Sequence, residues 1–233
     1  PLDIQGSKID PDTLEGYMPT EQPDYAPKQA DIDVIVEKLK TAKRPVIYAG
    51  NGIRIADAYP EFSQLVEVLQ IPVVTAWNSI DLMATEDSCY AGRGGTMGDR
   101  AGNFAVQNSD FLLSLACRLN LYQSGYDVKT WARAAYTVVV DIDPYELKKP
   151  TIRVDKPVCC DVKQLMVRLT ESWQKQGAAT DCEAWKKQCQ IWKKKYPVAQ
   201  SKHYKAEKAN VYAFVDTLSR HLPEGEVTVV ANG

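Results

Sequence analysis

Short apolar runs that alternate with helical segments constrain the fold of this chain more than any other feature. The runs are residues 44–49, 71–75, 111–116, 136–142 and 157–159. Apolar residues at helical spacing lie between or beside them, at residues 31–39, 57–69, 99–107, 128–134 and 161–174. Strands that helices cover on both faces have no polar side, so they read as continuous apolar runs. The alternation predicts an α/β fold with a doubly wound parallel sheet of about six strands, similar to a Rossmann fold.

Composition divides the chain into three parts. Residues 1–30 hold five of the thirteen prolines and predict an extended interdomain linker, since proline interrupts helices and strand ladders. Residues 31–177 form the predicted nucleotide-binding-like α/β domain, with Asp33 as a candidate helix cap. Residues 178–233 predict a linker helix and the truncated start of another domain, with a strand from residue 226. Because the chain opens without Met or a leader, we expect it to be a piece of a longer protein.

The helix predicted at residues 181–195 carries an aromatic stripe. Trp185, Cys189, Trp192 and Tyr196 recur at steps of four, three and four, which places them on one helix face. We expect this stripe to pack against the domain or a neighbouring chain, because a surface of that size promotes association when exposed. The lysines between the stripe residues are interpreted as the solvated side of an amphipathic helix.

Composition excludes several classes of partner. The net charge of −2 and the pI of about 5.8 give no field that attracts nucleic acid or an anionic membrane. No apolar run approaches the roughly 20 residues of a membrane-spanning helix. Six cysteines without a CxxC pair, and two histidines, give no zinc-site spacing, so reduced thiols in a cytoplasmic protein are the simplest interpretation.

Candidate binding residues follow the predicted strands. In parallel α/β sheets, ligands bind beyond the carboxyl ends of the strands, where loops present backbone N–H groups. Glycines let a diphosphate approach, arginine pairs with phosphate, and a carboxylate accepts hydrogen bonds from ribose. The candidate cofactor-binding residues at these exits are Gly50, Asn51, Gly52, Thr75, Ala76, Trp77, Gly95, Thr96, Met97, Cys117, Arg118, Asn120, Asp141, Ile142 and Asp161. We assign no catalytic and no metal-binding residue.

Each exit also has a purely structural interpretation. Gly50 and Gly52 lack the third glycine of GxGxxG and suit a tight strand-to-helix turn. Arg118 could form a surface ion pair instead of a phosphate contact. The carboxylates at the end of the run at residues 136–142 suit ribose or a helix cap at Asp143 equally well. Asp161 is interpreted as both a helix cap and a wall of the site. The sequence leaves these alternatives open.

The order of these motifs along the chain resembles the central domain of thiamine-diphosphate-dependent enzymes of the acetolactate synthase and pyruvate oxidase family. The resemblance covers almost the whole chain. It rests on PLDIQ at residues 1–5, KRPVIYAGNG at 43–52, IPVVT at 71–75, GTMG at 95–98, NFAVQNSD at 103–110, ACR at 116–118, DIDP at 141–144 and the W…WKKKYP helix at 185–197.

The resemblance implies a fragment of a 2-oxo acid decarboxylase or carboligase that uses thiamine diphosphate and Mg²⁺. It places the residues that bind both in N- and C-terminal domains outside this sequence, so we expect the fragment to be inactive alone. The full-length protein would form a homodimer or homotetramer. In this family the central domain binds FAD, an adenine nucleotide such as ADP, or nothing.

Two departures from the family pattern bear on the ligand. Ala116 stands where the family has the glycine of GAR, and residues 119–123 replace the acidic and arginine residues that follow it in acetolactate synthases. Both changes weaken the case for FAD. The alternatives are a purely structural central domain and a free-standing dinucleotide-binding domain of the sirtuin type. The second alternative lacks a catalytic histidine, because both histidines follow residue 200.

Overall fold

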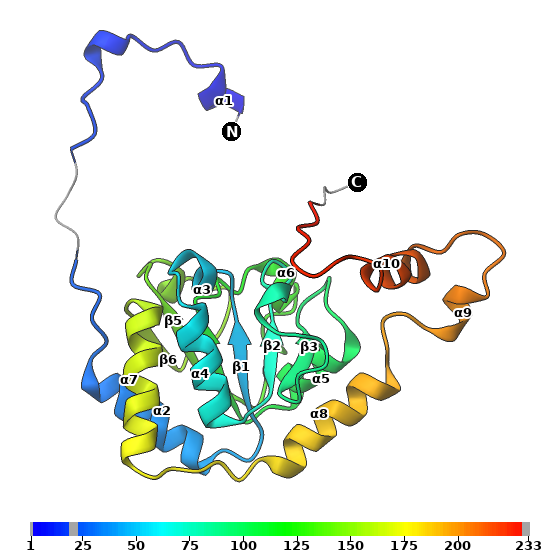
Figure 1. Cartoon of the computed structure of the whole chain (residues 1–233). Coiled ribbons are helices and arrows are strands. Elements are labelled where there is room, and N and C mark those ends of the chain that lie inside the picture. Colours follow the sequence, from blue (N-terminus) through cyan, green and yellow to red (C-terminus); the bar gives the residue numbers. More distant parts are fainter. Residues whose placement is uncertain (1, 19–22, 230–233) are drawn as a thin grey trace.

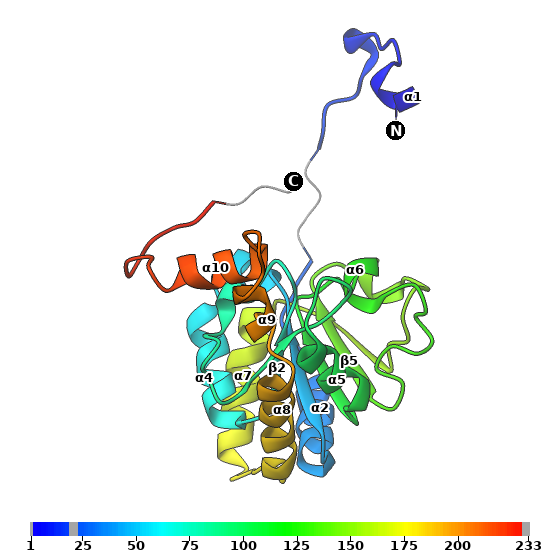
Figure 2. The ribbon, with the colours of Figure 1, turned by 90° about the vertical axis from the view of Figure 1, so that its right-hand side faces the viewer.

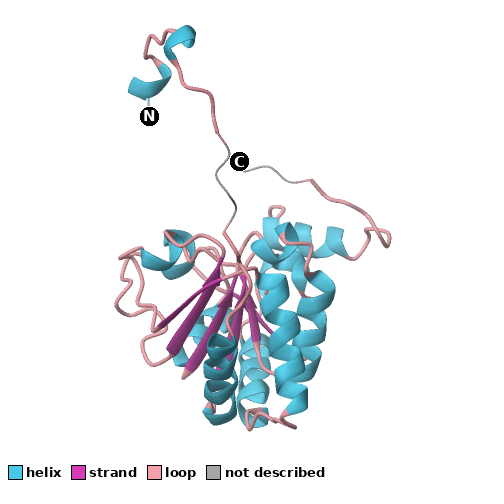
Figure 3. Ribbon diagram, turned by 90° about the vertical axis from the view of Figure 1, so that its left-hand side faces the viewer, coloured by secondary structure: helices cyan, strands magenta, loops and turns pink. Residues whose placement is uncertain are grey.

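Six parallel strands form the sheet predicted from the sequence. The structure is a computed structural model, and it describes residues 2–18 and 23–229. The strands are β1 (Pro45–Ala49), β2 (Val73–Thr75), β3 (Tyr90–Arg93), β4 (Phe111–Leu115), β5 (Tyr136–Asp141) and β6 (Lys156–Cys159). They are ordered β3-β2-β1-β4-β5-β6, and every neighbouring pair is parallel. This order, with helices beside the sheet (Figure 3), confirms the doubly wound, Rossmann-like fold.

Helices cover the sheet on both sides. One layer contains α2 (Gln29–Thr41), α4 (Tyr59–Leu69) and α7 (Val162–Lys175), and α7 contacts both of the other helices. On the other side, α5 (Arg100–Asn108) packs against β2 and β3 (Figure 2), and α8 (Glu183–Lys195) packs along α5 and β3. The remaining helices are α1 (Leu2–Gln5), α3 (Gly52–Ile55), α6 (Leu121–Ser124), α9 (Ser201–Tyr204) and α10 (Val211–Ser219), with 3₁₀ turns at Pro11–Thr13, Ile80–Leu82 and Glu146–Lys148 (Figure 1).

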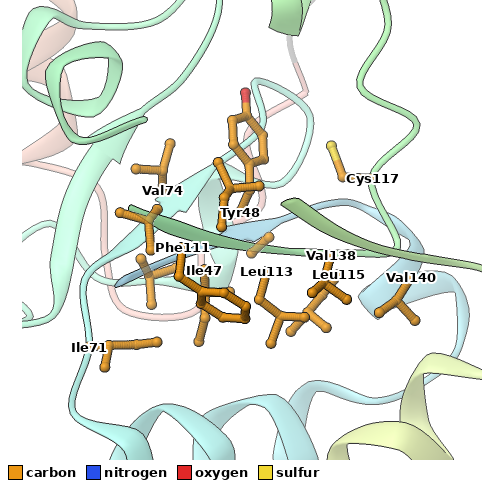
Figure 4. Packing of buried hydrophobic residues seen from close by; sticks show 14 of the residues in the cluster. Ile47, Tyr48, Ile71, Val74, Phe111, Leu113, Leu115, Cys117, Val138 and Val140 are labelled. Atoms are coloured by element: carbon orange, nitrogen blue, oxygen red, sulfur yellow. The ribbon is translucent and has the colours of Figure 1, made fainter. Parts of the chain in front are cut away.

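The core lies on both faces of the central strands. Every residue of β1 and β4 is buried, as expected for strands with helices on both sides. Ile47 pairs in register with Leu113, and Leu113 pairs with Val138. Figure 4 shows these side chains on the face that packs against the helices of one layer, whereas Tyr48 points to the opposite face.

Several local predictions were wrong. Residues 128–134 form turns instead of a helix, because Ala132 adopts a φ of 45°, which a right-handed helix does not allow. The predicted helix at residues 57–69 is preceded by a separate short helix, α3, and begins at Tyr59. Asp33 lies inside α2, which begins after Lys28, and its carboxylate accepts a hydrogen bond from Gln29 instead of capping the helix.

The strand predicted from Glu226 does not form within the described residues, and its last residues lie outside them. Residues 226–229 have no strand partner there, and Val227 and Val229 are exposed. Near the other end, the predicted extended linker of residues 1–30 contains the single turns of α1 and of Pro11–Thr13, and α2 already begins at Gln29. The end of this segment docks on α7, where the N–H of Asp161 donates to the Tyr25 carbonyl at 2.8 Å.

The aromatic stripe of α8 packs on the domain, as predicted. Trp185 is 6% exposed, and its indole N–H donates to the Pro45 carbonyl at 3.1 Å. Trp185 meets Trp192 edge to face at 5.5 Å between ring centroids. Phe104 of α5 contacts both Trp192 and Tyr196 at 5.6 Å. Among the helices of the described ranges, none combines the length and apolarity that crossing a bilayer requires.

Candidate functional site

The exits of β1 and β4 are in direct contact where the strand order reverses. The Gly50 N–H donates to the Leu115 carbonyl at 2.9 Å, and the Gly52 N–H donates to the Ala116 carbonyl at 3.2 Å. A Cβ at Gly50 would lie 2.2 Å from the Ala116 carbonyl oxygen, so only glycine allows this approach. The glycines therefore let two loops pack closely, and their N–H groups are satisfied within the chain. Asn51, between them, is half-buried.

The glycine-rich loop after β3 joins three strand exits into one rim. Its Gly94 N–H donates to the Thr75 carbonyl at 3.1 Å, and its Thr96 N–H donates to the Tyr122 carbonyl at 2.7 Å. Asn103 holds the loop through two hydrogen bonds of 2.9 Å with the backbone of Gly95. Gly95 adopts a φ of +98°, which favours glycine.

Exposed apolar side chains gather on this rim. Trp77 and Tyr122 lie 6.2 Å apart between ring centroids, and both are exposed. Met97, on the loop that Tyr122 holds, is 67% exposed. Ala76, by contrast, is buried, and the hydroxyl of Thr75 lies 3.4 Å from that of Tyr90. Of the candidates on this side of the site, the side chains of Trp77 and Met97 are therefore available to a ligand. Thr75 and Ala76 are buried and contribute backbone hydrogen bonds to the neighbouring loops.

Charged groups meet at the exits of β4 and β5. Nε of Arg118 lies 3.6 Å from one carboxylate oxygen of Glu146, and the ammonium of Lys149 lies 2.8 Å from the other. Lys149 also donates to the carbonyl of Arg118. Arg118 keeps most of its side chain in solvent, whereas Glu146 and Lys149 are mostly buried. The guanidinium of Arg118 is therefore accessible to a ligand, although Glu146 already contacts it.

Asp141 ends β5 beside this cluster. Burial raises the pKa of its carboxyl, while the N–H of Asp143, which donates to it at 2.9 Å, opposes that shift. The neighbouring Glu146 raises the pKa further, and Arg118 lowers it. A partly desolvated carboxylate beside a cation is the arrangement that would accept ribose hydroxyls next to a phosphate.

The raised pKa has a measurable consequence for stability. A carboxyl whose pKa is higher in the folded state destabilises that state once it ionises, and the cost disappears below its unfolded pKa of about 3.9. We expect Asp141→Asn to raise Tm at pH 7, and the gain over the unmodified chain to shrink as the pH falls toward 4. Thermal unfolding across this pH range checks it, with exposed Asp127→Asn as the control. A gain that is constant with pH, or absent at pH 7, would contradict the assignment.

The other candidates have mainly structural roles. Cys117 is fully buried, and burial raises the pKa of its thiol to about 12. Asn120 caps α6, and Asp161 caps α7 by accepting the Gln164 N–H at 2.8 Å. Ile142 is half-exposed beside Asp141.

Sequence reasoning missed several residues of the site. Glu146 and Lys149 lie about thirty positions from Arg118, and no sequence signal pairs them with it. Asn103 begins the NFAVQNSD motif, but the sequence gives no sign that its side chain binds the backbone of Gly95. Tyr48 is buried under Gly94, and its hydroxyl has no hydrogen-bond partner within the described chain. It lies in an otherwise apolar run, which gives no hint of a polar group.

Comparison with known proteins identifies one family and several relatives. A family model described as "Thiamine pyrophosphate enzyme, central domain" matches residues 32–169. A probable acetolactate synthase large subunit of Methanococcus aeolicus is 33% identical over 174 residues, covering 71% of this chain and 28% of that protein. The acetolactate synthase large subunit of Corynebacterium glutamicum is 30% identical, covering 78% and 29%.

A third relative has a different name. The sulfoacetaldehyde acetyltransferase of Rhodobacter capsulatus is 32% identical over 146 residues, which cover 62% of this chain and 24% of that enzyme. The chain thus spans less than a third of the length of these relatives. The family match covers more than half of the chain and includes all six strands. The chain belongs to the family of thiamine pyrophosphate enzyme central domains.

Proposed function

We propose that this chain is the central domain of a cytoplasmic, oligomeric enzyme that acts on 2-oxo acids with thiamine diphosphate and Mg²⁺. The family match and the two acetolactate synthase relatives support it. Thiamine diphosphate, when bound to the enzyme, would supply the nucleophilic and electron-accepting chemistry for this class of reaction. The proposal assigns the coenzyme to other domains of the enzyme, and assigns no catalysis to residues 1–233 alone.

The strand exits are the proposed site of an adenine nucleotide, either ADP or the ADP part of FAD. The juxtaposition of Arg118 and Asp141 at the exits of neighbouring strands supports this proposal, because it offers a phosphate partner beside a ribose partner. Trp77 and Tyr122 add exposed aromatic surface on the same rim. The side chains present therefore fit a nucleotide.

A purely structural domain is the second candidate, and one observation favours it. The N–H groups of Gly50, Gly52 and Thr96, which a diphosphate would need, already donate to carbonyls of the chain. A ligand would then depend on side chains alone. The N-terminus of α3 offers little help, since this helix has only four residues. That short helix also weighs against a free-standing dinucleotide-binding domain.

Titration of ADP and of FAD into the 233-residue chain separates the two candidates. We expect binding below millimolar concentration, weakened at least about tenfold by Arg118→Ala, because a charged hydrogen bond contributes about 1.5–3 kcal/mol. Glu146→Gln is expected to tighten binding about fivefold, because it removes the carboxylate that competes with phosphate for Arg118. Isothermal calorimetry measures both.

Exposed Arg133→Ala is the control for charge, since Arg133 lies away from the strand exits and is expected to leave the affinity unchanged. Failure of both ligands to bind a folded chain would favour the structural candidate. Equal weakening by Arg118→Ala and Arg133→Ala would show that the nucleotide binds by overall charge rather than at the strand exits.

A further inference from the structure

A cavity lies away from the exits of β4 and β5. It has a volume of about 670 Å³ and is lined by residues from the start of α5, the end of α8 and the segments of α9 and α10 that follow. Ligand pockets usually have volumes of about 300–1,000 Å³, so this space is large enough for a small molecule. None of its lining residues was predicted as a site.

Two unpaired cations line the cavity. Arg100, the first residue of α5, lies over the ring of Tyr196 at 5.6 Å from its centroid. Lys195, the last residue of α8, lies 5.5 Å from the same centroid. Within the described part of the chain, no carboxylate lies within 4.0 Å of either cation. The arrangement brings two positive charges to one aromatic ring without an acidic partner.

Asp99 is the one acidic residue among the described residues that line the cavity, and its oxygens are already engaged. One oxygen accepts the Gly102 N–H at 2.7 Å, and the other accepts the Arg93 N–H at 2.9 Å. Nε of Arg93 lies 3.9 Å from the same carboxylate and offsets its charge. Asp99 therefore does not neutralise Arg100 and Lys195, and the cavity has a net positive charge.

His203 adds a donor of defined direction. Its Nδ1 accepts the Gln200 N–H at 3.1 Å, so in the neutral ring the proton resides on Nε2. The imidazole stacks on the ring of Tyr212, with centroids 4.9 Å apart and an interplanar angle of 22°. This stacking orients the ring. Ser201, two residues earlier in α9, is exposed and lines the same space.

We propose that this cavity binds the phosphate or carboxylate group of a small-molecule ligand. Two unpaired cations supply the charge, and the Nε2–H of His203 and the hydroxyl of Ser201 supply hydrogen bonds. The aromatic rings of Tyr196 and Tyr212 hold these donors in place. The proposal is independent of nucleotide binding at the strand exits, because it uses none of the residues assigned there.

Titration of pyrophosphate into the isotope-labelled 233-residue chain tests the site. We expect the backbone amide signals of Ser201 and His203 to shift with saturation, and Arg100→Ala and Lys195→Ala each to weaken the affinity about tenfold. Lys187→Ala removes an exposed lysine from another part of α8 and is expected to change the affinity less than twofold. A parallel titration with citrate shows whether carboxylate serves as well as phosphate.

Amide spectra of each variant show whether it is folded. If Arg100→Ala unfolds the chain, the comparison of Lys195→Ala with Lys187→Ala decides the matter alone. Equal weakening by these two variants, or saturation without a shift at Ser201 and His203, would overturn the proposal. The same conclusion follows if neither anion saturates at millimolar concentration.

Discussion

Replacing Gly50 with alanine is expected to lower the free energy of unfolding by about 3 kcal/mol, at the upper end of the usual cost of overpacking. The new Cβ would lie 2.2 Å from the Ala116 carbonyl oxygen and 2.5 Å from Cα of Cys117. Both are backbone atoms, so no side-chain rotation relieves the clash, and the exits of β1 and β4 must separate. In a chain of this size, Tm should fall by roughly 6–12 °C.

Gly16→Ala is the matched control. A Cβ at Gly16 meets no atom within 4 Å, so its effect should stay within about 0.5 kcal/mol. Chemical denaturation of both variants measures the difference. If Gly50→Ala were as stable as the control, the two loops could not be in the close contact described above. The site at the switch point would then be open enough for a diphosphate to reach the backbone.

Trp185→Ala is expected to destabilise the chain by about 3–5 kcal/mol, the range for removing a large buried aromatic side chain. The indole is 6% exposed, contacts Trp192 edge to face, and donates to the Pro45 carbonyl. Its loss leaves a cavity between α8 and the start of β1. We therefore expect α8 to detach before the sheet unfolds, and amide exchange along α8 to increase most.

Two further variants separate packing from hydrogen bonding. Trp185→Phe keeps much of the ring but removes the indole N–H, and should cost about 1 kcal/mol beyond the lost ring area. Ile191→Ala, on the exposed side of the same helix, should cost less than about 1 kcal/mol. A Trp185→Ala variant no less stable than Ile191→Ala would show that α8 is not held on the domain through this residue.

Much of the fold was predictable because the determining signals are local. The apolar runs at β1, β4 and β5 predict buried parallel strands, since a strand with two buried faces needs no alternation. The stripe on α8 likewise predicts its packed face. β3 was missed because it is short and half of it, Gly92 and Arg93, reads as loop. Its strand conformation depends on pairing with β2, which is a tertiary contact.

The candidate site was predictable only in its location. The sequence by itself determined the family, the parallel sheet and the side chains at the strand exits, because motif order and apolar periodicity are properties of the chain alone. Only the tertiary structure decided which of these groups remain available to a ligand. In the folded chain the N–H groups of Gly50 and Gly52 donate to backbone carbonyls. Glu146 contacts Arg118, and Asp141 is partly desolvated. Hydrogen bonding, ion pairing and burial depend on distances between residues far apart in the sequence, and folding sets those distances.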